Sequence, residues 1–587
     1  MISRIWQGVD LIQGRRRNRQ LSRYLSTSEI GTFTSSDSLR VIVYHALLML
    51  CLTPITLQGN GVSDYYQSPV KHSVRLSGTF CELRPNHFHA GIDIRSAKGI
   101  AGDSIFSVAA GKLSRVRVQR SSYGQVLYID HDNGTTSVYA HLDEFHPKIE
   151  KLVKHYQYQH EESEIDIYLD STLVQIDKGD YIGTMGNTGR SYGAHLHFEI
   201  RDTATEEPIN PFLYGFGVED RSPPTLLSLW VYSLDKLGRI LSKKKLSTSK
   251  GNEDRLKATI TSTESPYIGI GIGAYDKIPN YKNYKGIYGA TVKSDQDTLC
   301  TYLNDRFNFN ENKGINGLID YQHYKSTNSR VMKLFKMQHQ DLSLFEDCES
   351  SRGIITLDSL AVQSLSVDFY DYDGNNVGID ISAPTWTNPY PQPLPRKVTN
   401  GKTYKNGNLS ITIPPDALFE DVDLILKQSG TTYTIGSESI PLNKPITVTI
   451  QSQMIDEGAF LMKPSKNQSY GGEVKGSTLT TTISELGTFK IGYDTKPPVI
   501  LTIRQSADRS KYTSWKFTVT DNIKDKSSTS SLQVSARIDD SYIRSTFDSK
   551  SNSLTIRDLD KIPENANTLR IIARDIHGNE AIRSYPL

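Results

Sequence analysis

The sequence predicts a mainly β protein of several domains, and three features of the chain point to this fold class. At 587 residues the chain is several times longer than one ordinary domain, so three or four domains, each with its own core, are expected. Tyrosine is abundant, with 32 Tyr against 18 Phe, which favours strands. Many segments alternate apolar and polar residues between turns that contain Gly, Asn or Pro. Long helical bundles do not fit this pattern.

Residues 1–61 are predicted to be an N-terminal extension. Its segment 41–61 is apolar over about 17 residues, whereas a membrane span needs about 20. Two alternatives follow: the segment is the core of a signal peptide whose true start lies downstream of Met1, or it is an uncleaved anchor. Both predict export to the cell envelope, in the periplasm or on the outer surface. Membrane contact is expected only through such an anchor.

Residues 62–215 are predicted to form a β domain with one helical insertion. The run GQVLYIDHDNGTTSVYAHL contains DNG, a hairpin signal, between two alternating stretches. The insertion, residues 146–172, begins with Pro147 at a favourable first helical position. The predicted helix places four apolar residues on one face: Ile149, Leu152, Val153 and Tyr156.

Proline-marked boundaries divide the rest of the chain into three β modules. Residues 216–394 are predicted to be a β-rich domain, 395–494 a β-sandwich module and 495–587 an Ig-like β-sandwich module. The turns DYDGNN (371–376) and DIHGNE (575–580) echo one another and indicate recurring sandwich modules. Their Asp and Asn residues suggest calcium, but the spacing lacks a full loop of ligands, so tight turns are expected. Three roles stay open for these modules: they could position a catalytic domain, bind wall glycan or contact another envelope protein.

Charge and cysteine content exclude two classes of function. The 67 basic and 65 acidic side chains nearly cancel, and the one dense basic run lies at residues 15–19, so no nucleic-acid partner is expected. Four scattered cysteines are too few for a disulfide scaffold or a cysteine-based zinc site. Cys300 and Cys348 are expected to be free buried thiols, with pairing in an oxidising compartment as the alternative.

Histidines gather in three short phrases of the first β domain, NHFHAGID, SVYAHL and GAHLHFEI. The five residues are His87, His89, His141, His195 and His197. On a strand, His195 and His197 would leave the backbone on the same side.

These phrases contain the ligand types of a catalytic zinc site, which uses three protein ligands and keeps a fourth position for water. His89 and Asp93 can supply a nitrogen and an oxygen from one short segment. One histidine of the 195/197 pair can complete the three, and the other would lie beside the metal. His141 adds a further unliganded imidazole, while His87 is not excluded as a ligand by geometry alone.

The three phrases resemble the LytM/lysostaphin-type zinc endopeptidases, a family with the duplicated hybrid motif fold that cuts the peptide part of bacterial peptidoglycan. The resemblance rests on HAGID at 89–93, AHL at 140–142 and GNTGRSYGAHLHFEI at 186–200, and it covers about a quarter of the chain. It implies a Zn²⁺ cofactor and a LytM-type peptidase domain within residues 62–215. The implied zinc ligands are His89, Asp93 and His197, and the implied catalytic residues are His141 and His195. The family pattern does not require His87.

The implied reaction is hydrolysis of peptidoglycan peptide crosslinks by a metal-activated water with a histidine as general base. The sequence has no HExxH helix, so the usual glutamate base is missing and His141 is the expected base. His195 is then expected to stabilise the oxyanion. Four glycines are expected either to let the backbone approach an extended peptide or to make plain turns: Gly183, Gly186, Gly189 and Gly193.

Two other functions remain as alternatives. A non-catalytic LytM-like regulator would bind a cell-wall amidase or the wall itself, although such proteins lose ligands and this sequence has all five expected residues. An endopeptidase of the same mechanism would instead cut protein. The insertion at 146–172 is expected either to cap the substrate groove or to decorate the surface, and Arg84 and Asn86 are expected to line the groove.

Overall fold

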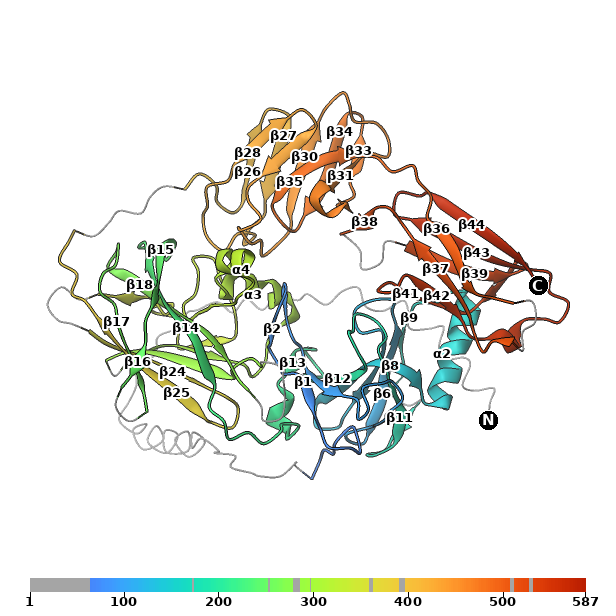
Figure 1. Cartoon of the computed structure of the whole chain (residues 1–587), viewed down its shortest axis with the longest axis horizontal. Coiled ribbons are helices and arrows are strands. Elements are labelled where there is room, and N and C mark those ends of the chain that lie inside the picture. The colour runs from blue at the N-terminus through green and yellow to red at the C-terminus, as the bar shows by residue number, and fades with distance from the viewer. Residues whose placement is uncertain are drawn as a thin grey trace, which may run out of the picture. The chain divides into compact units, whose positions relative to one another are not determined.

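The computed structural model describes residues 64–170, 174–251, 254–277, 285–295, 297–357, 363–389, 396–506, 511–526 and 532–587, and it confirms a mainly β protein. Figure 1 shows strands along all of these ranges, with few helices. The apolar segment 41–61 lies outside the described residues, so the signal peptide or anchor stays a prediction. Among the described residues, no helix combines the length and the apolarity that crossing a bilayer requires.

The histidine phrases lie in an eleven-stranded sheet whose main path runs β1-β4-β12-β8-β7-β6-β10. Its strands are β1 (Leu76–Gly78), β4 (Ile92–Arg95), β5 (Ser104–Phe106), β6 (Gly111–Val118), β7 (Gln125–Asp130), β8 (Thr135–Phe145), β9 (Ile165–Tyr168), β10 (Gln175–Ile176), β11 (Tyr181–Met185), β12 (His195–Asp202) and β13 (Pro208–Ile209). A separate two-stranded hairpin, β2 (Leu83–Arg84) and β3 (His87–Phe88), precedes β4.

Strand β12 lies between β4 and β8 and divides its side chains between two faces. Leu196, Phe198 and Ile200 are fully buried in the apolar core of the sheet. The alternate residues of the same strand therefore project from the opposite face. In the antiparallel register, His197 is opposite Asp93 on one side and Ala140 on the other. This register brings the second and third histidine phrases next to the HAGID phrase.

The insertion is a helix followed by a strand. Helix α2 (Pro147–His160) starts with the predicted proline and buries Ile149 and Val153. It ends at Glu161, which adopts a left-handed conformation with φ 55°. The insertion predicted as helical over residues 146–172 is therefore a helix only through His160, and the prediction is wrong for the described residues from there to 170. The period of two in Ile165 and Ile167, both buried, makes this part β9, which pairs with β6.

Two sheets follow in the region after residue 216. One contains β14 (Thr225–Leu234), β15 (Ile240–Leu246), β18 (Tyr267–Tyr275), β21 (Met332–Lys333) and β23 (Ile355–Thr356). The other contains β16 (Ser249–Lys250), β17 (Leu256–Thr259), β19 (Gly289–Ser294), β20 (Asp297–Leu303), β22 (Phe345–Glu346), β24 (Gln363–Tyr370) and β25 (Asn376–Ala383). Three short helices connect them: η3 (Phe309–Gly314), α3 (Ile315–Leu318) and α4 (Tyr321–Thr327).

Cys300 and Cys348 form a disulfide, so the expectation of free thiols is wrong. The two residues are 48 apart in sequence, yet β20 pairs with β22, which ends two residues before Cys348. That pairing brings their Cα atoms to 4.5 Å. Sequence spacing alone could not reveal this contact, because it depends on a short strand that carries little pattern of its own.

Two further pairs of sheets complete the chain. Residues 396–494 supply one whole sheet, which contains β26 (Lys402–Asn406), β27 (Leu409–Ile413), β30 (Ile446–Gln451), β33 (Glu473–Lys475) and β34 (Thr478–Ile483). They also supply most of a second sheet, which contains β28 (Leu426–Ser429), β29 (Thr432–Ile435), β31 (Phe460–Lys463), β32 (Gln468–Ser469) and β35 (Gly487–Gly492). Strand β38 (Lys524–Asp525), from later in the chain, pairs with β32 at the edge of this second sheet. The last pair contains β36 (Val499–Arg504), β37 (Trp515–Thr520), β41 (Ser545–Asp548) and β42 (Ser553–Ile556), facing β39 (Leu532–Ile538), β40 (Ser541–Ile543), β43 (Thr568–Asp575) and β44 (Glu580–Pro586). Each pair encloses its own apolar core, as expected for β-sandwich modules.

Candidate metal and catalytic site

Three side chains converge at the junction of β4 and β12. His89 Nε2 lies 3.0 Å from Asp93 Oδ1 and 3.0 Å from His197 Nδ1, and the last two atoms are 2.9 Å apart. All three residues are buried. These three atoms form a small triangle of two imidazole nitrogens and one carboxylate oxygen. This is the donor set of a zinc site that keeps a fourth position open.

The remaining nitrogen of each histidine in this triangle has a hydrogen-bond acceptor. His89 Nδ1 donates to the Thr79 carbonyl at 2.7 Å, which leaves Nε2 with a free lone pair. His197 Nε2 donates to Glu199 Oε1 at 2.7 Å, which turns Nδ1 toward Asp93. Acceptors in this position fix the tautomer and orientation of metal-binding histidines. Burial lowers the pKa of His89 to about 4, so its ring is neutral near pH 7.

Glu199 and Arg201 continue the line of polar side chains on β12. Glu199 is fully buried and Arg201 donates Nε–H to its Oε2 at 2.6 Å. Burial alone would raise the pKa of Glu199, but Arg201 and His197 lower it to about 2, so Glu199 is charged. Burial alone would lower the pKa of His197, but its hydrogen bonds to Asp93 and Glu199 raise it to about 9, so Nδ1 must lose its proton before it can bind a metal ion. Sequence reasoning missed Glu199 and Arg201, although their spacing of two continues the alternation of His195 and His197.

Arg84 holds the second oxygen of Asp93. From the β2–β3 hairpin, Arg84 Nη2 donates to Asp93 Oδ2 at 2.5 Å, while Oδ1 faces the two histidines. The hairpin is fixed by Phe88, whose ring packs on Phe307 and whose N–H donates to Asn312 Oδ1. Arg84 therefore positions the carboxylate of Asp93, and its expected place along the groove stays a prediction.

His141 lies next to this triangle on a distorted part of β8. Ala140 and His141 together face Val126 of β7, which is a β-bulge, and His141 has φ 63°, a left-handed conformation. Its N–H donates to the Tyr123 carbonyl and its Nδ1 to the Thr188 carbonyl at 2.8 Å. Burial, together with His197 and His195, lowers its pKa to about 3. The ring is therefore neutral and its Nε2 can accept a proton.

His195 is the second imidazole beside the triangle. Its Nδ1 lies 2.9 Å from the Gly193 carbonyl, and its Nε2 lies 3.5 Å from Asp93 Oδ1. The rings of His195 and His141 are 4.9 Å apart between centroids. The structure thus brings together all five predicted site residues, three in a metal-binding arrangement and two beside it.

His87 does not join the group. Its Nδ1 contacts the Pro85 carbonyl on the hairpin, and it is absent from the metal-binding group of described residues. Asn86, the other residue expected at the groove, contacts the Asn316 side chain. These positions leave His87 as a matched control for the buried histidines.

The predicted glycines differ in their structural reasons. A Cβ at Gly183 or Gly186 would meet the β8 backbone within 2.5 Å, so close strand packing requires glycine there. Gly189 has φ 67° and lies against Gly124. At Gly193, with φ 119°, a Cβ would meet no atom of the described residues within 4 Å. Packing within the chain therefore accounts for three of the four.

Residues of the last module contact the loop that leads into β12. Lys550 Nζ donates to the carbonyls of Asn187 at 2.6 Å and Ser191 at 3.0 Å. The outward face of α2 contacts the same module, where Glu150 pairs with Arg544 at 2.9 Å. Helix α2 thus has one face in the core and one against another module, and its proposed gating role stays a prediction.

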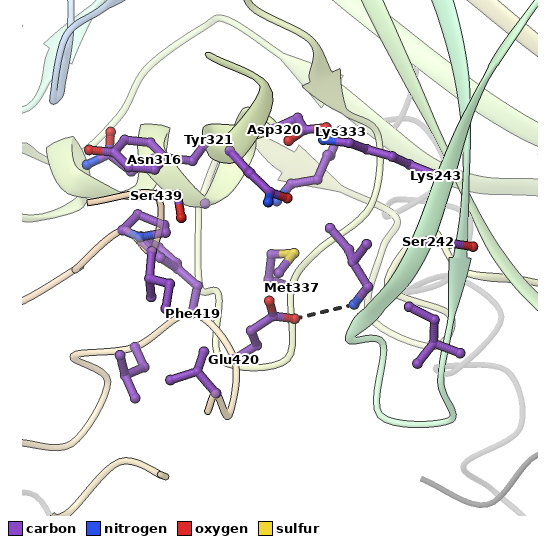
Figure 2. Close-up of a pocket in the computed structure, with 18 residues that line it drawn as sticks. Ser242, Lys243, Asn316, Asp320, Tyr321, Lys333, Met337, Phe419, Glu420 and Ser439 are labelled. Carbon is purple, nitrogen blue, oxygen red and sulfur yellow. Dashed lines mark hydrogen bonds and ion pairs between the residues drawn. The ribbon is translucent and has the colours of Figure 1, made fainter. Parts of the chain in front are cut away.

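A cavity of about 410 Å³ lies between residues of the 216–394 region and residues of the 396–494 region. Figure 2 shows Lys243, Asp320, Lys333 and Glu420 around it. Lys243 pairs with Asp320 at 2.7 Å. Burial lowers the pKa of Lys333 to about 8, although Glu420 and Asp320 oppose this shift. None of the five predicted site residues lines this cavity.

Comparison with known families agrees with this geometry. Residues 87–159 and 158–211 match Peptidase family M23, and residues 396–494 match the Zu5-like domain. The matched M23 range contains the five residues of the site.

Individual relatives match over the same part of the chain. The DD-carboxypeptidase/endopeptidase Mpg of Neisseria meningitidis is 26% identical over 147 residues, which are 25% of this chain and 24% of that protein. An uncharacterized metalloprotease of Haemophilus influenzae is 28% identical over 148 residues, 24% of this chain and 25% of that protein. The catalytic domain of lysostaphin from Staphylococcus simulans is 16% identical, covers 24% of this chain and 91% of that chain, and has a TM-score of 0.18. The chain spans about a quarter of the length of the curated relatives it matches.

Proposed function

We propose that the protein, whose residues 87–159 and 158–211 match Peptidase family M23, is a zinc-dependent endopeptidase that hydrolyses peptide crosslinks of bacterial peptidoglycan. The observation that carries this proposal is the triangle of His89 Nε2, Asp93 Oδ1 and His197 Nδ1, with sides of 2.9–3.0 Å. The relative Mpg, named a DD-carboxypeptidase/endopeptidase, supports a wall peptide as substrate.

The three ligands are proposed to hold Zn²⁺, which supplies Lewis-acid polarisation of the scissile carbonyl and activation of water. Arg84 fixes Asp93, and Glu199 and the Thr79 carbonyl fix the two histidines. This set keeps the donor atoms in place, so little reorganisation is needed when the ion binds.

His141 is the proposed general base. Since its Nδ1–H is committed to the Thr188 carbonyl, its Nε2 is the atom that takes the proton from the attacking water and passes it to the leaving amine.

His195 is the proposed stabiliser of the oxyanion. Its Nδ1–H points to the Gly193 carbonyl, and its Nε2 lies 3.5 Å from Asp93 Oδ1, so Nε2 is the ring nitrogen next to the metal-binding triangle.

We further propose that the protein acts in the cell envelope. Disulfides persist in oxidising compartments, so the Cys300–Cys348 bond supports export, as does the signal-like segment 41–61. The modules after residue 216 are proposed to contact the wall or an envelope protein.

Digestion of purified sacculi by the zinc-loaded protein tests the proposal, with products read by mass spectrometry. Loss of crosslinked dimers is expected, together with its suppression by a zinc chelator and by His197→Ala. His141→Ala should retain zinc and lose roughly 10²- to 10⁴-fold in rate. His87→Ala is the matched control and should cleave as the wild type does.

The same experiment separates the alternatives. A folded, zinc-loaded protein that leaves sacculi intact but binds them or a cell-wall amidase would support the regulatory function. Cleavage of an unfolded protein without cleavage of sacculi would identify a protein substrate. Either result would contradict the proposed peptidoglycan endopeptidase.

A further inference from the structure

Three buried aspartates from separate segments meet in the region after residue 216. Asp220 precedes β14, Asp276 follows β18 and Asp371 follows β24. Each offers a carboxylate oxygen, and these atoms lie within 4.8 Å of one another. The exposed fractions of the three residues are only 6%, 6% and 4%. Buried carboxylates at this separation repel one another unless a proton or a cation lies between them.

One oxygen in this group has no hydrogen-bond partner among the described residues. Asp220 Oδ2 is buried and unpaired, whereas Asp220 Oδ1 accepts from the Ser222 N–H at 2.8 Å. A buried carboxylate oxygen without a donor is costly, and native proteins almost always satisfy such an atom with a donor, a water or an ion. The unpaired oxygen belongs to the residue that meets Asp276 and Asp371.

The carboxylates are held in place by the surrounding backbone. Asp371 accepts from the N–H of Asn375 through Oδ1 and from its side chain through Oδ2. The same Asn375 side chain donates to the Asp220 carbonyl at 3.0 Å. The Asp276 side chain accepts from the Lys277 N–H at 2.9 Å. These contacts fix the positions of the acids without neutralising them.

The surroundings add negative charge to the group. Asp373 Oδ2 accepts from the Asp220 N–H, which brings a fourth carboxylate to its edge.

The same frame occurs again at the start of the last module, where ligand atoms of Asp521 and Asp575 and of Asp494, the residue before this module, also lie within 4.8 Å of one another. Asn579 repeats the contacts of Asn375, because its side chain donates to Asp575 Oδ2 and to the Asp494 carbonyl. The two groups differ in burial and in the turn: Asp494 and Asp521 are only partly buried, and His577 stands where the first turn has Asp373.

We propose that Asp220, Asp276 and Asp371 form a binding site for a hard divalent cation of the Ca²⁺ type. Three carboxylates with no histidine or cysteine among them are the ligands that such a cation prefers, and zinc prefers nitrogen and sulfur. The site joins the segment that enters β14 to the ends of β18 and β24, so the cation ties three parts of one module together. The site was missed from sequence because the DYDGNN turn supplies only one of its three ligands.

Calcium binding to the zinc-loaded full chain tests the proposal. Equilibrium dialysis with ⁴⁵Ca²⁺ is expected to show binding with a Kd of about 10⁻⁴–10⁻³ M, the range of extracellular modules. Asp276→Asn is expected to bind one Ca²⁺ fewer per chain. Exposed Asp297 of the same region supplies the matched control, and Asp297→Asn should bind as the wild type does.

Thermal unfolding provides a second measurement that does not depend on activity. At about 5 mM CaCl₂ the wild type should gain about 2–4 °C in Tm. Asp276→Asn should lose this gain and, without calcium, should be at least as stable as the wild type, because one of the repelling charges is gone. Equal calcium binding and an equal gain in Tm for Asp276→Asn and the wild type would overturn the proposal, as would no binding by the wild type.

Discussion

Arg84 Nη2 lies 2.5 Å from Asp93 Oδ2, while Asp93 Oδ1 faces His89 and His197. One oxygen of the carboxylate therefore belongs to an ion pair and the other belongs to the metal-binding triangle. Arg84 comes from a two-stranded hairpin that is separate from the sheet carrying Asp93 and His197. The geometry of the triangle thus depends on a part of the chain that lies outside this sheet.

Arg84→Met should lower zinc affinity about 10- to 100-fold, because Asp93 loses the partner that orients it. Competition with a chromophoric chelator measures this change directly. Arg95→Met is the matched control, since Arg95 is an exposed arginine two residues after Asp93, and it should keep wild-type affinity. Equal affinities for the two variants would show that Arg84 does not position Asp93.

Glu199→Gln should weaken zinc binding and also destabilise the fold. The substitution leaves Arg201 as a buried charge without its carboxylate, which costs about 3–5 kcal/mol of unfolding free energy. Denaturant unfolding measures this loss.

The double variant Glu199→Gln/Arg201→Met separates the two effects of Glu199. It removes the unpaired charge, so most of the stability should return while the zinc affinity stays low. Full recovery of zinc affinity in the double variant would contradict a role for Glu199 in orienting His197.

Much of this site could be predicted from the sequence because it depends on local periodicity. The spacing of two in His195 and His197 predicts a shared face, and the burial of Leu196 and Phe198 on the other face agrees with it. Arg84 and the Thr79 carbonyl could not be predicted in their roles, because their contacts depend on how distant segments fold together. The end of α2 was missed because the pattern changes from a period of 3.6 to a period of two within five residues.

Removing the Cys300–Cys348 disulfide should cost about 4 kcal/mol of stability, since it closes a loop of 48 residues in the unfolded chain. The Tm of the wild type should fall when a reductant is added. The double variant Cys300→Ala/Cys348→Ala should already be less stable and should not respond to the reductant. A wild-type Tm that is the same with and without reductant would count against the bond.

Lys333 should make stability depend on pH in the alkaline range. Its pKa is about 8 in the folded protein but near 10.4 in the unfolded chain, so the unfolded chain binds the proton more tightly. Stability should therefore rise between pH 8 and about 10.4, by up to about 3 kcal/mol, and this gain is lost as the pH falls through 8.

Lys333→Met isolates this contribution. Its stability should exceed that of the wild type at pH 7, and the difference between the two proteins should shrink as the pH rises toward about 10.4. Unfolding by denaturant across this range measures the difference. The matched variant Lys257→Met, at an exposed lysine, should run parallel to the wild type. A constant difference for Lys333→Met would mean that Lys333 is charged in the folded protein throughout.

The side chains of strand β12 alternate strictly between the site and the core. Residues an even number of positions from His195 face the site, whereas Leu196, Phe198 and Ile200, at odd positions, face the core. Loss of one residue at the start of the strand would exchange the two sets, placing phenylalanine and leucine where the imidazoles stand and sending the imidazoles into the core. A change of one residue in the register of β12 would therefore disrupt the site and the core together. The same eight residues therefore determine both the packing of this strand and the placement of the site side chains, and an insertion or deletion of an odd number of residues there would disrupt both.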